Sequence, residues 1–293
     1  MSINGIIIID KPADWTSHDV VAKLRGALKI KRVGHGGTLD PMATGVLPIF
    51  LGGATKASQF CENAEKEYIA GLRLGITTDT QDVTGNVLSR REPSTSSAEL
   101  SDALQSFVGA QKQIPPMYSA IKVNGEKLYK LARRGTVVPR PARDIYISVI
   151  ELLGVSGSDY SLRVVCSKGT YIRTLCHDIG AALGCGGAMS ALRRTRAGAF
   201  IIDAAHTLDE ILVDVAESAI AKYILPVDSL FSKYLVVTLS AAETRKFKNG
   251  VPYSCGNLPS NKYRFYGPDK EFLAICDVVN GSAVESRRFF DTL

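Results

Sequence analysis

The sequence holds little that points to a metal protein, a secreted protein or a membrane protein. Its six cysteines form no Cys-x-x-Cys pair, and its four histidines do not stand at ligand spacing from them. The longest apolar run near the amino terminus is residues 6–9, far short of the ~20 residues that a membrane span requires. We therefore expect reduced cysteines, no metal site, no membrane anchor and a cytoplasmic location.

Common nucleotide-binding and hydrolase motifs are missing as well. The chain contains no Gly-x-x-x-x-Gly-Lys-[Ser/Thr], no Gly-x-Gly-x-x-Gly, no His-Glu-x-x-His and no Gly-x-Ser-x-Gly, which removes sequence support for the corresponding enzyme classes. Global disorder is excluded too, because 45% of the residues are hydrophobic and only 22% are charged. A chain of 293 residues with this composition predicts about two globular domains.

Positive charge is present in moderate excess, and it is clustered. The net charge is +6, and residues 122–143 carry seven bases against the single acid Glu126. Residues 20–39 carry five bases and no acid, and Arg193, Arg194 and Arg196 form a third cluster. One such run is most often a solvated helix face. Three acid-poor clusters favour a polyanionic partner, because phosphates bind bases through the release of counterions.

Hydrophobic patterns predict strands and helices in a mixed order. Residues 5–10 and 46–51 are expected to be buried strands, and Tyr68 lies near the start of a strand of period two. Thr16 and Asp19 predict a capping box that begins a helix, and further helices are expected over residues 126–134 and 171–183. The absence of regular β-α-β repetition argues for an α+β domain, and the last 60 or so residues predict a small β-rich module.

An irregular loop over residues 32–45 separates two apolar elements and contains four glycines. It places the carboxylate of Asp40 where glycines allow a backbone to approach a ligand closely. A plain turn is the ordinary alternative, since Asp before Pro is common turn chemistry. The residues of the loop by themselves leave both interpretations open.

The segment that contains this loop resembles a known family. Residues 34–48, Gly-His-Gly-Gly-Thr-Leu-Asp-Pro-Met-Ala-Thr-Gly-Val-Leu-Pro, are similar to the signature of the TruB family of tRNA pseudouridine synthases, apart from Gly36, where the bacterial family more often has Thr. The resemblance extends over about residues 5–230. Its other blocks are Asp10-Lys11-Pro12, Lys66-Glu67-Tyr68, Pro116-Met117-Tyr118-Ser119-Ala120, Ser167-Lys168-Gly169-Thr170-Tyr171-Ile172-Arg173 and Leu192-Arg193-Arg194-Thr195-Arg196.

The resemblance implies a fold and a domain organisation. It implies the pseudouridine synthase fold, with a mixed, mainly antiparallel sheet flanked by helices and loops. The catalytic domain is then residues 1–230, with an RNA-clasping insertion at about residues 116–144. Residues 231–293 correspond to a small β-rich, PUA-like C-terminal domain.

The resemblance also implies an activity. Family members convert uridine 55 in the T loop of tRNA to pseudouridine without a metal or organic cofactor, so the expected partner is the tRNA T stem-loop, bound by a monomer with no obligatory protein partner. Asp40 corresponds to the catalytic aspartate, which acts as a nucleophile or assists ribose deprotonation. Arg173 corresponds to the arginine that pairs with this aspartate and keeps it ionised.

Further site residues follow from the same blocks. Tyr68 corresponds to the tyrosine that stacks on the target base and helps to remove its C5 proton, and Tyr171 and Leu192 correspond to residues that line the base pocket. Without the resemblance, each would be interpreted as a core residue. His35 corresponds to the histidine that enters the RNA in place of the flipped bases. The resemblance places three further bases in the RNA clasp: Lys130, Arg133 and Arg134.

Two alternative functions remain open. One is a guide-RNA-dependent pseudouridine synthase of the dyskerin type, which the clasp-like segment at residues 122–143 disfavours. The other is a tRNA-binding or tRNA-folding protein without catalysis, which the joint presence of Asp40, Tyr68 and Arg173 disfavours.

Overall fold

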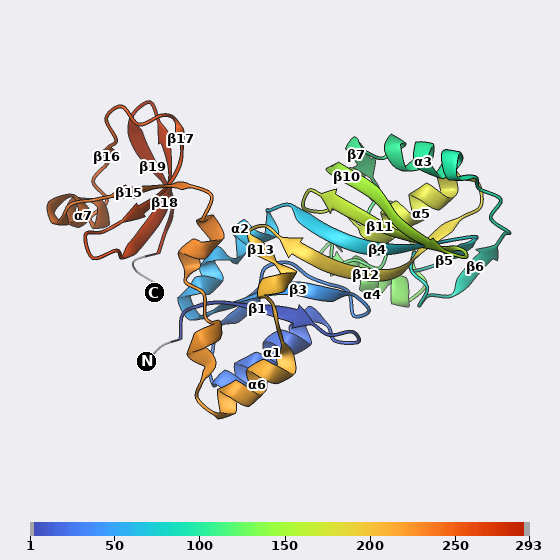
Figure 1. Ribbon diagram of the computed structural model, residues 1–293, viewed down its shortest axis with the longest axis horizontal. Helices are drawn as coiled ribbons and strands as arrows, with labels where there is room; N and C mark the ends of the chain where they lie inside the picture. Colours follow the sequence, from blue (N-terminus) through green and yellow to red (C-terminus); the bar gives the residue numbers. More distant parts are fainter. Residues whose placement is uncertain (1–2, 290–293) are drawn as a thin grey trace. The chain divides into compact units, whose positions relative to one another are not determined.

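The computed structural model describes residues 3–289 and divides the chain into two compact units. The first unit consists of residues 1–40, 46–62 and 198–293, and the second consists of residues 41–45 and 63–197. Figure 1 shows the elements of both units along the chain. Strand β3 (Thr44–Leu51) begins with two residues of the second unit and continues with residues of the first.

The first unit contains a small mixed sheet. In it β1 (Gly5–Lys11) lies between β14 (His206–Thr207) and β3, and β2 (Val33–His35) pairs with β3. The β1–β14 pair is parallel and the β2–β3 pair is antiparallel. Its other elements outside the C-terminal module are α1 (Ser17–Leu28), η1 (Gly52–Ala57), α2 (Ser58–Glu62), β13 (Phe200–Ile201), η2 (Ile202–Ala204), α6 (Leu208–Ala216), η3 (Ile220–Tyr223) and η4 (Val227–Phe231).

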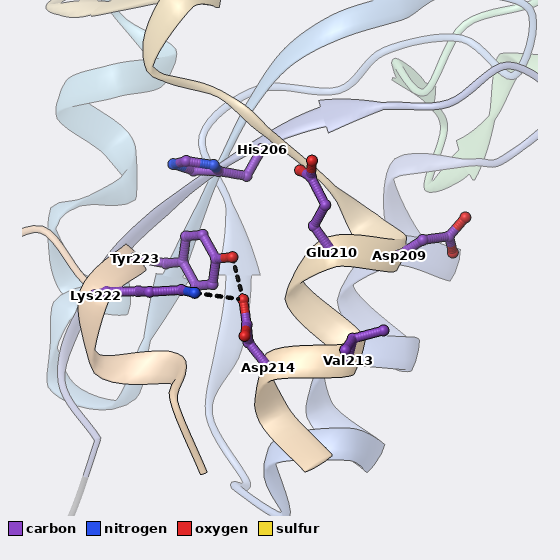
Figure 2. A pocket seen from close by; sticks show the side chains of 7 residues that line it. All are labelled: His206, Asp209, Glu210, Val213, Asp214, Lys222 and Tyr223. Atoms are coloured by element: carbon purple, nitrogen blue, oxygen red, sulfur yellow. Dashed lines mark hydrogen bonds and ion pairs between the residues drawn. The ribbon is translucent and has the colours of Figure 1, made fainter. Parts of the chain in front are cut away.

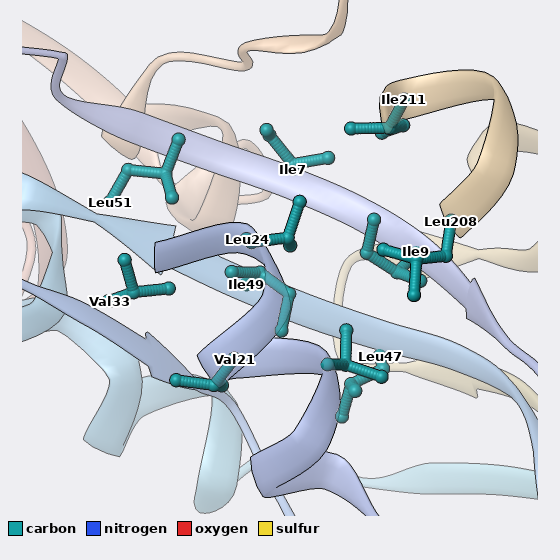
Figure 3. Packing of buried hydrophobic residues seen from close by; sticks show 11 residues of the cluster. Ile7, Ile9, Val21, Leu24, Val33, Leu47, Ile49, Leu51, Leu208 and Ile211 are labelled. Atoms are coloured by element: carbon teal, nitrogen blue, oxygen red, sulfur yellow. The ribbon is translucent and has the colours of Figure 1, made fainter. Parts of the chain in front are cut away.

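Two helices pack on this sheet through one apolar core. The predicted capping box at the start of α1 is confirmed: the Thr16 hydroxyl accepts from the Asp19 N–H at 3.1 Å, and the Asp19 carboxylate accepts from the Thr16 N–H at 2.8 Å. Figure 3 shows Leu24 of α1 and Ile211 of α6 among the core residues of β1 and β3. Each such buried side chain stabilises the fold by about 1.5–3 kcal/mol, more than the intrinsic helix propensity of a short segment can supply.

The C-terminal module of the first unit is β-rich, as predicted. Its five strands pair in the order β15-β17-β18-β19-β16 around the buried Phe265. The β15–β17 pair is parallel, and the other pairs are antiparallel. The elements are β15 (Leu235–Thr238), α7 (Ala241–Lys248), β16 (Tyr253–Ser254), β17 (Asn261–Tyr266), β18 (Phe272–Val279) and β19 (Ser282–Arg288).

The second unit is built on a mainly antiparallel sheet. Its strands run in the order β12-β4-β11-β10-β7, and β12 also pairs in parallel with Thr44 and Gly45 of β3. The Gly180–Gly187 pair lets α5 lie close to β12: a Cβ at Gly180 would be 2.1 Å from the Gly187 nitrogen. The strands are β4 (Lys66–Leu74), β7 (Gly109–Gln113), β10 (Arg143–Ser156), β11 (Asp159–Cys166) and β12 (Gly187–Ala197), with the helices α3 (Ser97–Ser106) and α5 (Ile172–Ala182).

Two small hairpins complete this unit, and one of them corrects a prediction. Strands β5 (Ile76–Thr78) and β6 (Val87–Arg90) form the first, and β8 (Lys122–Val123) and β9 (Glu126–Lys127) form the second. Helix α4 (Leu128–Arg133) therefore begins two residues later than residue 126. The reason is the Asn124-Gly125 turn, whose positive φ angles of 50° and 83° join β8 to β9.

The α+β class and the mixed, mainly antiparallel sheet are confirmed. All six cysteines are buried. Burial raises the pKa of the Cys166 thiol to about 11 and that of Cys176 to about 12, so neither is a reactive thiolate. Within residues 3–289 no helix is both long enough and apolar enough to cross a membrane.

Candidate active site

The loop that carries Asp40 belongs to the first unit and follows β2. The Gly36 N–H donates to the Pro48 carbonyl at 2.9 Å, so the loop leaves β2 along the hairpin with β3. A Cβ at Gly36 would lie 2.8 Å from the Cys61 sulfur and 2.9 Å from the ring of Phe50. This explains the departure from Thr at position 36, because Cys61 and Phe50 already fill the space of a side chain. Asp40 itself is half-buried.

His35 is the last residue of β2 and lies at the start of the same loop. Its Nδ1 accepts a hydrogen bond from the Gly37 N–H at 3.3 Å, so the neutral ring carries its proton on Nε2. The ring meets that of His18 in a T-shaped contact, with centroids 5.3 Å apart. His35 is half-buried and is oriented by groups of its own unit.

Tyr68 and Leu192 lie on one face of the sheet in the second unit. On β4, Tyr68 stands opposite Arg194 of β12, and Ala70 stands opposite Leu192. Directly opposed residues of an antiparallel pair point to the same face, so Tyr68 and Leu192 are diagonal neighbours. Each is 8% exposed. The structure therefore brings these two predicted pocket residues together.

Arg173 is held by three groups of the second unit. It lies in the first turn of α5 and is 6% exposed. Its Nη1 donates to the Thr80 carbonyl at 3.2 Å, and its Nη2 donates to the Tyr118 carbonyl at 2.8 Å. The Asp82 carboxylate lies 3.6 Å from Nη1. With both side chains only 7% exposed, the guanidinium has a fixed position in a site of low water content.

Asp82 is a site residue that sequence reasoning missed. Its Oδ1 accepts from the Thr84 N–H at 3.0 Å and from the hydroxyls of Thr80 and Thr84 at 2.9 and 2.6 Å. These bonds leave Oδ2 to face Arg173. The signal was present in Thr80-x-Asp82-x-Thr84-Gly85, a pattern that favours an Asp side chain bonded to the backbone two residues on.

Gln113 is a second missed residue, and it holds Tyr171. The Gln113 Oε1 accepts from the Tyr171 N–H at 2.8 Å, and its Nε2 donates to the Tyr171 carbonyl at 3.0 Å. Gln113 is 4% exposed, and Tyr171 is the N-cap residue of α5. The side-chain amide thereby fixes the start of the helix that carries Arg173. Nothing in the sequence alone pairs two residues that are 58 positions apart.

The three predicted clasp residues lie on or directly after α4 and are exposed. Arg134 forms an ion pair with Glu126 at 2.7 Å, and the guanidinium of Arg133 lies over the Tyr129 ring, 5.5 Å from its centroid. The Tyr129 N–H donates to the Ser119 carbonyl at 3.1 Å. The basic helix is thus attached to the residue that follows Tyr118, whose carbonyl binds Arg173.

The described residues of each unit line at least one open cavity of moderate size. The cavity of about 660 Å³ in the first unit is lined by Asp209, Glu210 and Asp214 and by the rings of His206 and Tyr223, with Lys222 bonded to Asp214 (Figure 2). None of its lining residues is a predicted site residue. The cavity of about 590 Å³ in the second unit includes Leu192 in its lining. Three carboxylates against one lysine make the first cavity unsuited to phosphate.

Among the described residues, no group of three His, Cys, Asp or Glu side chains could hold a metal ion.

Family models match the chain in two consecutive parts. The model described as TruB family pseudouridylate synthase (N terminal domain) matches residues 25–172, and the model described as tRNA pseudouridylate synthase B C-terminal domain matches residues 173–232. The second match begins at Arg173. The family models therefore cover the segments that contain all nine predicted site residues.

Curated proteins and solved structures are similar over most of the chain. A tRNA pseudouridine synthase B of Ectopseudomonas mendocina is 41% identical over 294 residues, covering 99% of this chain and 96% of that protein. A protein of the same name from Alkaliphilus oremlandii is 46% identical over 257 residues, covering 81% and 86%. A chain in the crystal structure of a Cbf5-Nop10-Gar1 complex has a TM-score of 0.75 and 28% identity, covering 98% of this chain and 85% of that one. By these matches, the chain belongs to the TruB family of pseudouridylate synthases.

Proposed function

We propose that this protein isomerises uridine to pseudouridine at position 55 in the T loop of tRNA. The observation that carries the proposal is identity of 40% and more, over nearly the whole chain, to proteins named tRNA pseudouridine synthase B. We further propose that the protein acts as a monomer in the cytoplasm. Uridine and pseudouridine are isomers, so the reaction consumes no oxidant, reductant or group donor.

Asp40 is the proposed catalytic residue. The reaction breaks the bond between ribose C1′ and N1 and forms a bond between C1′ and C5, after which C5 loses a proton and N1 gains one. An ionised carboxylate can attack C1′, or it can take a ribose proton and so assist departure of the base. Both routes need a carboxylate close to the sugar. The half-buried Asp40, in a glycine-containing loop that allows close approach of a ligand, suits either one.

Arg173 is the proposed electrostatic partner of the Asp40 carboxylate. A guanidinium favours the ionised form of a carboxylate, and it does so most strongly where water is excluded. Bonds to the carbonyls of Thr80 and Tyr118 and the ion pair with Asp82 support this role. Because these contacts already hold the side chain in one position, it loses little further conformational entropy when the substrate binds.

Tyr68, Leu192 and Tyr171 are the proposed walls for the extruded base. A base removed from a folded loop loses a few kcal/mol of stacking and pairing, and aromatic and apolar side chains offset part of this loss. The shared sheet face of Tyr68 and Leu192 supports this assignment. The hydroxyl of Tyr68 is proposed to help remove the C5 proton, and His35 to occupy the place in the RNA that the base leaves.

Lys130, Arg133 and Arg134 are proposed to bind phosphates of the T stem. Replacing all three with glutamine is expected to weaken tRNA binding and to flatten its dependence on salt. Each phosphate contact contributes about 0.7–0.9 to the slope of log K against log salt. Because Glu126 already pairs with Arg134, we expect the slope to fall by about 2 rather than 3. Filter binding at several salt concentrations measures this slope.

A matched control replaces Arg90 and Lys112, two exposed bases of the same unit that lie outside the proposed clasp. This double variant is expected to retain the wild-type slope. If the triple variant also retains it, residues 122–143 are only a solvated surface and the clasp assignment fails.

The guide-RNA-dependent alternative has one observation in its favour. Chains in the Cbf5-Nop10-Gar1 complex and in an H/ACA RNP bound to a substrate RNA have TM-scores of 0.75 and 0.73. Their identity to this chain is 28% and 27%, below the 41% found for the tRNA enzyme that covers 99% of it. Sequence identity therefore favours action on tRNA without a guide.

Tritium release decides between these functions. Purified protein is incubated with a tRNA transcript labelled with tritium at uridine C5, in the presence of EDTA and without added cofactor. We expect release to approach one tritium per tRNA labelled at position 55, and to disappear when that uridine is replaced. Tight tRNA binding without release would contradict the proposal. A repeat with guide RNA would then separate a guide-dependent enzyme from a binding protein.

A further inference from the structure

A buried hydroxyl of the first unit binds both polar groups of the backbone residue that precedes Asp40. Ser17 is the first residue of α1 and is 0% exposed. Its Oγ accepts a hydrogen bond from the Leu39 N–H at 2.8 Å and donates one to the Leu39 carbonyl at 3.2 Å. The Leu39 carbonyl belongs to the peptide group that joins Leu39 to Asp40. The Ser17 side chain thus restrains the Leu39–Asp40 peptide group through its carbonyl.

The hydroxyl is itself held by a rigid element. The capping box of Thr16 and Asp19 closes the first turn of α1, and Val20, Val21 and Leu24 anchor the helix in the core with exposures of 5% or less. A polar group on a packed helix has little freedom to follow a moving loop. Because Ser17 is part of this fixed helix, its hydrogen bonds hold the backbone of Leu39 in a fixed position relative to α1.

Two further bonds restrain the loop upstream of Leu39. Gly36 is bonded to the Pro48 carbonyl, and Gly37 is bonded to the ring of His35, so both restrain the upstream part of the loop. Leu39 as a whole is 3% exposed, which places its backbone groups where water is scarce. Without a partner, a buried N–H and carbonyl are costly, and the loop would shift to satisfy them.

We propose that Ser17 is a positioning residue for Asp40: its hydroxyl fixes the Leu39–Asp40 peptide so that the carboxylate reaches the sugar in the geometry of attack or proton removal. This inference rests on the proposed function of Asp40. A catalytic group displaced by about 1 Å can lose about 100-fold in rate while the bound substrate is unaffected. Ser17 touches no substrate atom in this role and acts through the loop alone.

The test compares Ser17→Ala with a hydroxyl deletion of the same kind elsewhere in the unit. The Thr207 hydroxyl caps α6, whose Leu208 and Ile211 pack in the same apolar core as α1. For both variants, single-turnover tritium release at saturating protein, tRNA affinity and thermal stability are measured. We expect Ser17→Ala to slow release by about 10- to 100-fold, with tRNA affinity within about threefold of wild type. Thr207→Ala is expected to lose stability but to keep the rate within about twofold.

Hydrogen exchange of the loop gives a second measurement that does not depend on activity. The amides of residues 37–40 and 42 are expected to exchange faster in Ser17→Ala and to be unchanged in Thr207→Ala, because only the first variant loses the bond to Leu39. If Ser17→Ala does not fold, Ser17→Cys replaces it, since a thiol keeps the shape of the side chain and weakens both bonds.

The outcomes separate the two proposals. Slower release with intact affinity and faster loop exchange supports the inference. A wild-type rate in folded Ser17→Ala overturns it, and so do equal losses of rate in both variants, because the serine would then be structural only. A wild-type chain without tritium release contradicts the proposed function, whereas the amide exchange of residues 37–40 and 42 still decides whether Ser17 holds the loop.

Discussion

Asp40→Asn is expected to abolish pseudouridine formation while leaving tRNA binding nearly intact. Asparagine has the shape of aspartate but can neither attack C1′ as an anion nor accept a ribose proton. We expect the single-turnover rate to fall by at least about 10⁴-fold, near the upper limit for loss of a general base and within the range for loss of a nucleophile. Because the carboxylate acts in the transition state, tRNA affinity should remain within about threefold.

The measurement is tritium release with excess protein, paired with filter binding of the same tRNA. Asp209→Asn is a suitable control, because it removes a carboxylate of the same unit that lines the unrelated cavity beside α6. This control is expected to retain the wild-type rate. Substantial activity of Asp40→Asn in a preparation free of host enzyme would remove Asp40 from the catalytic role.

Asp82→Ala is expected to reduce both stability and rate. The carboxylate lies 3.6 Å from Arg173, and each side chain is 7% exposed. Removing one partner of a buried ion pair takes away a compensating charge, at a cost of up to about 3–5 kcal/mol. Loss of this partner also frees Arg173 to move, and we expect the rate of tritium release to fall by about 10- to 100-fold. Urea unfolding and single-turnover kinetics measure the two effects.

A second ion pair of the same unit provides the control. Asp159 binds Arg73 at the shorter distance of 2.7 Å, but the two side chains are 38% and 44% exposed. Water screens an exposed pair, so Asp159→Ala should cost only about 0–1 kcal/mol despite the shorter distance. If Asp159→Ala destabilises the chain as much as Asp82→Ala, burial does not determine the strength of these pairs. A wild-type rate in Asp82→Ala would show that the Asp82 carboxylate does not position Arg173.

Local signals in the sequence predicted much of the fold. The β-branched run at residues 5–10 forms β1, and the Thr16 and Asp19 side chains begin α1 as expected. Such signals succeed because a strand period or a helix cap depends on residues only a few positions apart. The helix predicted over residues 126–134 forms over Leu128–Arg133, and it starts two residues late because the adjacent Asn124-Gly125 turn uses Glu126 and Lys127 as a hairpin strand. The turn therefore set the first residue of the helix, and the helix itself formed as predicted.

The sequence by itself determined the family, and with it the candidate roles of Asp40, Tyr68 and Arg173. These residues belong to contiguous motifs, which can be recognised in the sequence without a structure. Tertiary structure alone decided what supports them. Ser17 meets Leu39 across 22 positions, Gln113 meets Tyr171 across 58, and Arg173 meets Thr80 across 93. Each contact joins a side chain to a backbone group, and every residue type presents nearly the same backbone groups. The path of the folded chain therefore determines which backbone group each of these side chains binds. A short sequence pattern contains no information about that path.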